Sequence, residues 1–113
     1  MSKDSILRQK SFDFAVRVIN LFKYLKRKHG EQVIAKQILR SGTSARALIR
    51  EVEFAECRKD FMHKLHISMK EMNESICWFE LLHASGYITF KMFNSMQEDA
   101  VALLKMLVSS IKL

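Results

Sequence analysis

The most informative segment of the chain reads VIAKQILRSGTSARALIREVEFAEC and covers residues 33–57. At about 100° per residue, its apolar side chains fall on one helical face that runs through the small residues 41–44. This apolar face consists of Ile34, Ile38, Ala45, Leu48, Ile49 and Val52. The opposite side carries a ridge of cations within an arc of roughly 120°, made up of Lys36, Arg40, Arg46 and Arg50. The segment therefore predicts a packed helix that presents positive charge to a partner.

Gly42 lies in the middle of this predicted helix. A glycine inside a helix is destabilising by roughly 1 kcal/mol relative to alanine. We therefore expect either a kink or a close contact with another helix at Gly42.

The composition favours one helical domain. The 113 residues include three glycines and no proline, which is too few turn-forming residues for a β-sandwich or barrel. Apolar residues make up 49% of the chain, and a chain of this length can bury a core. We predict a single all-α domain over residues 1–113.

Apolar periodicity and stop signals divide the chain into four predicted helices. They cover about residues 6 or 12 to 29, 32–56, 59–84, and 89 to the C-terminus. Gly30 is expected to end the first helix in the left-handed conformation, and Thr89 is expected to cap the fourth. Heptad-like seams with short connections predict an antiparallel up-down-up-down four-helix bundle.

Two of these helices have more apolar surface than a bundle core needs. The first helix carries two apolar stripes, and the fourth helix has a stripe beside its core stripe. The stripes of the first helix are Phe12, Ala15, Ile19 and Phe22 and, separately, Phe14, Val18, Leu21 and Leu25; the added stripe of the fourth is Val101, Leu104, Val108 and Ile111. Surplus apolar stripes usually lie against another surface, most simply a second copy of the chain. We therefore predict a homo-oligomer.

The net charge of +7 is concentrated in the first part of the chain. Residues 1–50 contain twelve Lys and Arg against three Asp and Glu, whereas residues 51–113 contain seven against nine. Such a balance favours an anionic partner, most commonly nucleic acid, but a solvated surface that limits aggregation produces it too. The candidate nucleic-acid-binding residues are Arg17, Lys23, Lys26, Arg27, Lys36, Arg40, Arg46 and Arg50. Among them, we expect Arg40 to form a structural ion pair, and Arg46 and Arg50 to contact phosphates.

No motif in the sequence predicts catalysis. The chain lacks a nucleophile elbow, a phosphate-binding loop and a Cys-x-x-Cys motif. Glu80 and His83 have the spacing of a bundle di-metal site, but the other predicted helices offer no second pair. We predict that the protein is not an enzyme and has neither a metal nor a cofactor.

The cellular location is expected to be cytoplasmic, without a membrane partner. No apolar run approaches the roughly 20 residues that a membrane span needs. The first residues, Met1-Ser2-Lys3-Asp4, lack the apolar core of a signal peptide. Cys57 and Cys77 are interpreted as reduced packing residues.

A set of motifs spread over nearly the whole chain resembles a known family. The motifs are Lys10-Ser11-Phe12-Asp13-Phe14-Ala15, Gln37-Ile38-Leu39-Arg40-Ser41-Gly42-Thr43-Ser44, Glu51, Lys59-Asp60-Phe61, Lys70-Glu71, Asn73-Glu74, Trp78, Glu80-Leu81-Leu82 and Gly86-Tyr87-Ile88. In this order they resemble the four-helix-bundle family encoded within intervening sequences of bacterial large-subunit ribosomal RNA genes. After Ser44 that family commonly continues with small or polar residues and an asparagine, whereas this chain has Ala45-Arg46-Ala47-Leu48-Ile49-Arg50.

The resemblance implies an up-down bundle that assembles as a ring-like homopentamer. It also implies kinship with the accessory variability proteins of diversity-generating retroelements, which bind a reverse transcriptase and nucleic acid through a basic surface. No enzymatic activity is ascribed to the family.

Together, these observations predict a non-enzymatic oligomeric bundle that binds nucleic acid, and RNA in particular. It would act as an accessory to a reverse transcriptase or to a ribosomal RNA-associated element. The alternative is a protein-binding adaptor or scaffold that makes no direct contact with nucleic acid.

Overall fold

The computed structural model describes residues 2–112, apart from the side chains of residues 3 and 4. The helices are α1 (Lys3–His29), α2 (Val33–Glu51), α3 (Arg58–Ala84) and α4 (Phe90–Lys112), and one 3₁₀ turn, η1 (Val52–Phe54), follows α2. No β-strand occurs within residues 2–112, and the predicted all-α class is confirmed.

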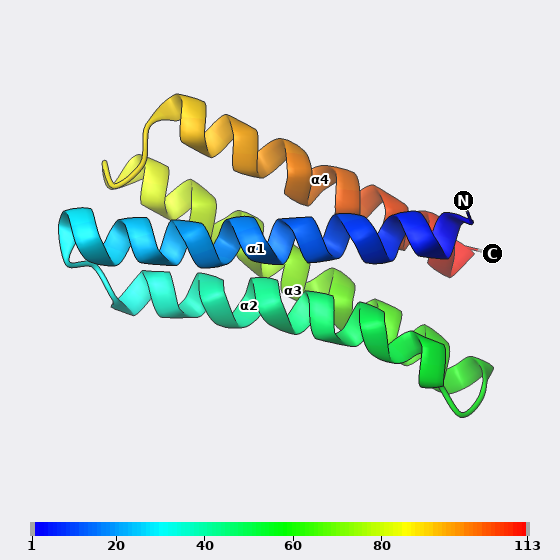
Figure 1. Cartoon of the computed structure of the whole chain (residues 1–113). Helices are drawn as coiled ribbons and strands as arrows, with labels where there is room; N and C mark the ends of the chain where they lie inside the picture. The colour runs from blue at the N-terminus through cyan, green and yellow to red at the C-terminus, as the bar shows by residue number, and fades with distance from the viewer. Residues whose placement is uncertain (1, 113) are drawn as a thin grey trace.

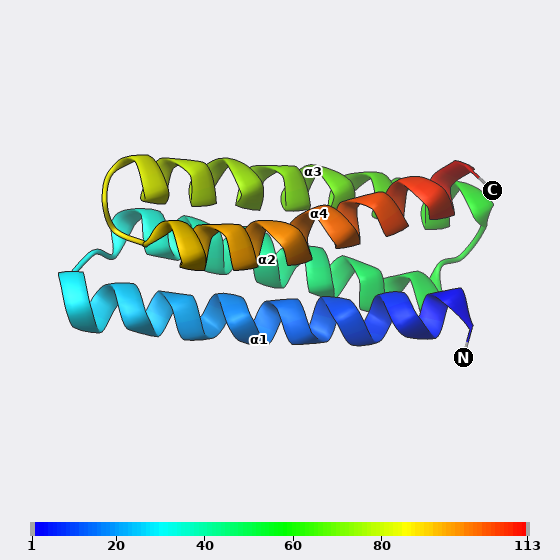
Figure 2. The same ribbon diagram turned by 90° about the horizontal axis from the view of Figure 1, so that it is seen from above.

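The four helices lie side by side along one long axis. Figures 1 and 2 show that the chain reverses direction at each connection between them. α1 packs against α2 and α4, and α3 packs against the same two helices. The resulting molecule measures 44 × 21 × 21 Å, so its length is set by single uninterrupted helices.

The core is apolar and receives side chains from all four helices. Its largest fully buried side chains include Phe14, Leu25, Ile38, Ile49, Leu65, Met72, Phe79, Leu82, Leu103 and Leu107. The rings of Phe14 on α1 and Phe79 on α3 pack in a T-shaped, edge-to-face arrangement, with centroids 6.2 Å apart. Burying each such side chain contributes about 1.5–3 kcal/mol to folding, so the shared core supplies most of the stabilisation.

The helix ends are closed by local hydrogen bonds. Gly30 follows α1 with φ 64°, in the left-handed region that was expected. Thr89 Oγ1 accepts a backbone N–H of α4 at 3.1 Å, which confirms the predicted cap. Glu31 caps α2, because its carboxylate accepts the N–H groups of Ile34 and Ala35 at 2.9 Å each.

Two helix boundaries differ from the predictions. α1 begins at Lys3, because the side chain of Ser2 caps it by accepting the N–H of Ser5 at 3.2 Å. The second helix ends at Glu51 and not near residue 56. The chain tightens into η1, which begins at Val52, the last residue of the predicted apolar face, and Phe54 in this turn is 76% exposed.

The two cysteines are free and exposed, so their interpretation as packing residues is wrong. Cys57 lies in the connection that precedes α3. Cys77 lies on α3 between the core positions Ser75 and Phe79, which places it on the outer side of that helix.

Surplus apolar surface remains on the outside of the molecule, as the sequence predicted. On α1, Phe12, Val16 and Ile19 are 50%, 40% and 37% exposed, whereas Ala15 is buried in the contact with the rest of the bundle. The stripe on α4 is half-buried and consists of Val101, Leu104, Val108 and Ile111. No described helix combines the length and the apolar character that a membrane crossing requires.

Candidate nucleic-acid interface

The pair of helices α1 and α2 forms the scaffold of the basic surface. Their backbones approach closely at the buried Gly42, where a Cβ atom would lie 2.8 Å from Cγ2 of Val18. Of the two alternatives predicted at this glycine, a kink or a close helix contact, the structure shows the close contact. It holds the cations of α1 next to those of α2.

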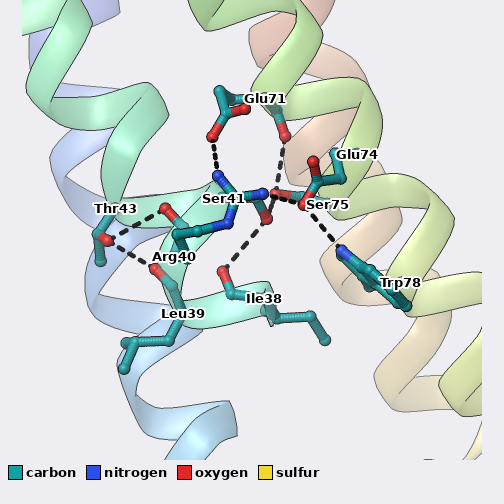
Figure 3. A network of polar contacts seen from close by, with 9 residues as sticks. All are labelled: Ile38, Leu39, Arg40, Ser41, Thr43, Glu71, Glu74, Ser75 and Trp78. Carbon is teal, nitrogen blue, oxygen red and sulfur yellow. Dashed lines mark hydrogen bonds and ion pairs between the residues drawn. The ribbon is translucent and has the colours of Figure 1, made fainter. Parts of the chain in front are cut away.

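The cations of the ridge on α2 contact different neighbouring helices. Arg40 leans toward α3, where its Nη1 donates to Glu71 Oε2 at 2.8 Å and its Nη2 pairs with Glu74 (Figure 3). The hydrogen bond to Glu74 and the charges of both carboxylates raise the pKa of Arg40. The expected structural ion pair is thus confirmed, and it occupies Arg40 within the protein.

Glu74 is held from two sides. Trp78 Nε1 donates to Glu74 Oε2 at 3.0 Å, and Arg40 reaches the same carboxylate (Figure 3). The hydrogen bond from Trp78, followed by that from Arg40, lowers the pKa of Glu74. This residue therefore stays ionised at neutral pH and neutralises one member of the ridge.

Buried hydroxyl groups join α2 to α3 beneath the ion pairs. The Oγ atoms of Ser41 and Ser75 lie 2.7 Å apart, and Ser75 also donates to the carbonyl of Glu71 at 3.1 Å (Figure 3). Ser68 donates to the carbonyl of Ala45 at 3.1 Å. These bonds fix the register of the two helices and so fix the position of the cations above them.

Arg46 leans the other way, toward α1. Its Nη1 donates to the carbonyl of Arg8 at 2.8 Å and to Ser11 Oγ at 3.3 Å, and its guanidinium lies 5.5 Å from the ring centroid of Phe12. Burial lowers the pKa of Arg46, and the neighbouring charges of Arg50 and Arg8 act in the same direction. Arg46 is therefore half-buried against α1 in a locally cationic environment.

An open groove of about 540 Å³ lies beside Arg46, between the first turns of α1 and the last turns of α2. Arg8 borders it and pairs with Glu53, while Arg50 is exposed. The groove is lined by Ser5, Arg8, Gln9, Phe12, Arg46, Arg50 and Glu53. Three arginines thus face a single carboxylate around one cavity.

Arg17 forms its polar contacts with α4 and lies apart from the ridge on α2. Its guanidinium pairs with Asp99 and donates to Ser95 Oγ at 2.8 Å. This candidate therefore ties α1 to α4.

The other candidates cluster where α1 ends and α2 begins. Lys23, Lys26 and Arg27 lie in the last two turns of α1, and Lys36 lies in the first turn of α2. All four are exposed, and none forms an ion pair with another described residue. Since only residues 30–32 separate the two helices, these cations share one end of the molecule (Figure 1).

Sequence reasoning missed two residues of this surface, Arg8 and Phe12. Both border the groove, and they lie one helical turn apart on α1. The earlier of the two expected helix starts, residue 6, already places both residues on one face. Phe12 was interpreted only as part of an apolar stripe, and the approach of this face to Arg46 and Arg50 depends on the packing of α1 against α2.

Metal binding finds no support in the described part of the chain. No group of three or more His, Cys, Asp or Glu side chains within it lies close enough to hold an ion.

Comparison with known proteins identifies the family. The family model described as "23S rRNA-intervening sequence protein" matches residues 3–109. A crystal structure described as a protein with unknown function from the S23 ribosomal protein family of Bacteroides thetaiotaomicron VPI-5482 is 47% identical, with a TM-score of 0.98; the match covers 99% of this chain and 100% of that one. A search of curated proteins found no match. Because the family match spans nearly all of the four helices, the chain belongs to the 23S rRNA-intervening sequence protein family.

Proposed function

We propose that this chain is a non-enzymatic, oligomeric helical bundle that binds nucleic acid, and RNA in particular, through the basic surface of α1 and α2. One observation carries the proposal. Carboxylates pair with Arg17 and Arg40, but within residues 2–112 the other exposed candidates have no such partner. These unpaired cations are Lys23, Lys26, Arg27, Lys36 and Arg50.

Cations on the outside of two adjacent helices suit a phosphate backbone. Binding through such contacts releases counterions, so it is strongly salt-dependent and has little sequence preference. The family's description associates its members with intervening sequences of 23S rRNA, which makes RNA the first ligand to test.

Self-association is part of the proposal. We expect an up-down bundle that assembles as a homopentamer in the cytoplasm and acts as an accessory to a reverse transcriptase or to a ribosomal RNA-associated element. The exposed Val16 and Ile19 on α1 and the apolar stripe on α4 support an interface between copies. Light scattering tests this part, and a stable 13.2 kDa species at micromolar concentration would contradict it.

RNA binding is tested by fluorescence anisotropy with a labelled structured RNA at about 50 and 200 mM salt. The native chain should lose at least about tenfold in affinity over this range, because several phosphate contacts are involved. The variant Lys23→Glu/Lys26→Glu/Arg27→Glu should bind at least about tenfold more weakly at low salt. No binding at low salt, or an affinity that ignores salt, would contradict the proposal.

The matched control places the same change of charge on the other half of the molecule. Lys70, Lys105 and Lys112 are exposed on α3 and α4. Changing all three to glutamate should weaken RNA binding much less than the α1 variant does. An equal loss would show that binding follows net charge and does not depend on the α1–α2 surface.

A protein-binding adaptor is the second candidate function. Phe12, Val16 and Ile19 are exposed apolar residues of α1, and Phe12 borders the groove that three arginines line, a combination that suits an acidic protein surface. Copurification with one stoichiometric protein, unchanged by nuclease treatment, would favour this function over nucleic-acid binding.

A further inference from the structure

We infer that the groove between α1 and α2 is a subsite for one unpaired nucleotide, with the phosphate facing Arg46 and Arg50 and the base stacked on Phe12. The inference rests on the proposed nucleic-acid binding. It goes further because it names a single cavity, the part of the ligand that enters it and the preference for single-stranded over duplex RNA.

The size of the groove fits this ligand. Its volume of about 540 Å³ lies within the range of roughly 300–1,000 Å³ that is typical of small-molecule sites. It is open to solvent along the outside of the α1–α2 pair, so a nucleotide can enter while the chain on either side of it continues over the surface. The exposed cations at the other end of α1 lie along the same pair of helices.

The charges around the groove favour a phosphate. Arg8, Arg46 and Arg50 border it, and Glu53 is the one carboxylate among its lining residues. Glu53 pairs with Arg8, and its charge also acts on Arg46, but neither Arg46 nor Arg50 forms an ion pair with a residue that lines the groove. An anion bound there would offset the repulsion between these guanidinium groups.

The guanidinium of Arg46 is preorganised for such a ligand. Both of its hydrogen bonds, to the carbonyl of Arg8 and to Ser11 Oγ, use the same nitrogen, Nη1. Within the described structure, Nε and Nη2 therefore keep the capacity to donate to a phosphate oxygen. Because two protein acceptors already fix the guanidinium, binding need not immobilise a free side chain.

Phe12 offers an aromatic ring for stacking, which a nucleotide base can use and inorganic phosphate cannot. Arg46 lies over its ring at 5.5 Å, yet the residue remains 50% exposed and lines the groove. An exposed aromatic ring next to cations suits a ligand that joins an anion to a planar ring, as a nucleotide does. A base in a duplex is already stacked on its neighbours, so only an unpaired base can stack on Phe12.

The test compares variants of the full chain with a labelled 12-nucleotide RNA, used as a single strand and as a duplex of the same sequence. Phe12→Ala should weaken single-strand binding about tenfold and leave duplex binding within about twofold. Arg50→Gln should weaken single-strand binding about tenfold, because Arg50 faces the groove and has no ion pair among the described residues.

Two matched controls lie outside the groove. Phe90→Ala removes an exposed aromatic side chain from the first turn of α4, and Lys36→Gln removes an exposed cation from the ridge on α2. Phe90→Ala should leave single-strand binding within about twofold, and Lys36→Gln should weaken single-strand and duplex binding alike. Sedimentation of each variant shows whether its oligomeric state has changed.

A crosslinking experiment tests the native chain directly. Single-stranded RNA that contains 5-iodouridine is bound to the protein and irradiated. The crosslink should appear in the tryptic peptide of residues 11–17, which contains Phe12. Because the crosslink is measured on the native chain, it tests the nucleotide subsite even if Phe12→Ala alters assembly. Crosslinks confined to other peptides would overturn the inference, as would unchanged single-strand binding by an assembled Phe12→Ala protein.

These results also separate the two proposals. If RNA binding is salt-dependent but unchanged in Phe12→Ala and Arg50→Gln, the nucleotide subsite is overturned and the proposed function remains intact. An absence of RNA binding at low salt would overturn both. Tight binding of inorganic phosphate alone, with no gain from an attached nucleoside, would show that the groove is a simple anion site.

Discussion

The two sides of α2 present arginines to very different neighbours. On the side of α3, Arg40 meets Glu71 and Glu74, so its charge is neutralised inside the protein. On the side of α1, Arg46 meets a backbone carbonyl, a hydroxyl and the Phe12 ring, and its positive charge is retained. The spacing of cations along one helix shows where charge lies, but the adjacent helix decides whether that charge is available to a ligand.

The packing beneath the arginines differs in the same way. Toward α1, the contact depends on the absence of a side chain at Gly42, which admits the isopropyl group of Val18. Toward α3, the contact depends on buried hydroxyls such as Ser41 and Ser75. One interface is sensitive to volume and the other to the loss of a hydrogen bond.

The largest effect is expected from Gly42→Val. A Cβ atom at this position would already lie 2.8 Å from Val18 Cγ2, and Val18 is fully buried and stiff, so the two helices must move apart. We expect the free energy of unfolding to fall by about 3 kcal/mol, at the upper end of the usual range for overpacking. Urea denaturation followed by circular dichroism measures this loss.

A valine elsewhere on α2 is the control. Ala47→Val places the same side chain at an exposed position and should change the unfolding free energy by less than about 1 kcal/mol. Equal stabilities for the two valine variants would mean that α1 and α2 are not in close contact at Gly42.

The opposite interface is tested by Ser75→Ala. The Ser41 hydroxyl would lose its partner at 2.7 Å and keep only a long contact of 3.4 Å to the carbonyl of Ile38. We expect a loss of about 1–2 kcal/mol, because Ser41 is fully buried. The double variant Ser41→Ala/Ser75→Ala should lose less than the sum of the two single variants, and strict additivity would rule out the coupling.

Sequence patterns predicted most of the fold because the relevant signals are local. Apolar periodicity marked the helical cores, Gly30 and Thr89 marked two helix ends, and Gly42 marked the close helix contact. The patterns failed after Glu51, where the predicted apolar face continues to Val52 although the helix does not. The 3₁₀ turn there belongs to the connection with α3, and periodicity carries no information about a change of direction.

The candidate site was less accessible from sequence, since the pairing of charges depends on tertiary neighbours. The same ridge contains Arg40 and Arg50, and nothing in their spacing shows that one faces two carboxylates and the other a groove. Arg17 was placed among the binding residues, yet its partner Asp99 is 82 positions away in sequence. Long-range ion pairs of this kind require the packed helices to be known.

Arg40→Gln and Arg50→Gln compare the two kinds of arginine directly. Arg40→Gln should lower the unfolding free energy by up to about 1 kcal/mol, because half-exposed ion pairs contribute little. Its effect on RNA affinity should be small. Arg50→Gln should leave stability within about 0.5 kcal/mol and weaken RNA binding. Thermal unfolding and anisotropy on the same samples measure both properties, and a reversal of the two outcomes would contradict the division of the ridge.

The smallest effect concerns pH. The hydrogen bonds from Trp78 and Arg40 lower the pKa of Glu74 from its ordinary value of 4.5. Since the carboxylate binds its proton less readily in the folded state, its contribution is complete above about pH 4.5 and is lost as the pH falls through the lowered pKa. The native chain should therefore exceed Glu74→Gln in stability by less than about 1 kcal/mol at pH 6, and this difference should shrink toward pH 3.

Trp78 is the single tryptophan of the chain, so its fluorescence follows unfolding in each of these measurements. Glu80→Gln is the matched control, because Glu80 is exposed on the same helix and forms no ion pair with another described residue. Comparing the two variants at pH 6 and pH 3 shows whether the effect of the substitution depends on the ion-paired position. If the Glu74 variant behaved in the same way, the carboxylate would not contribute through its ionised form, and the neutralisation of Arg40 would have to come from Glu71 alone.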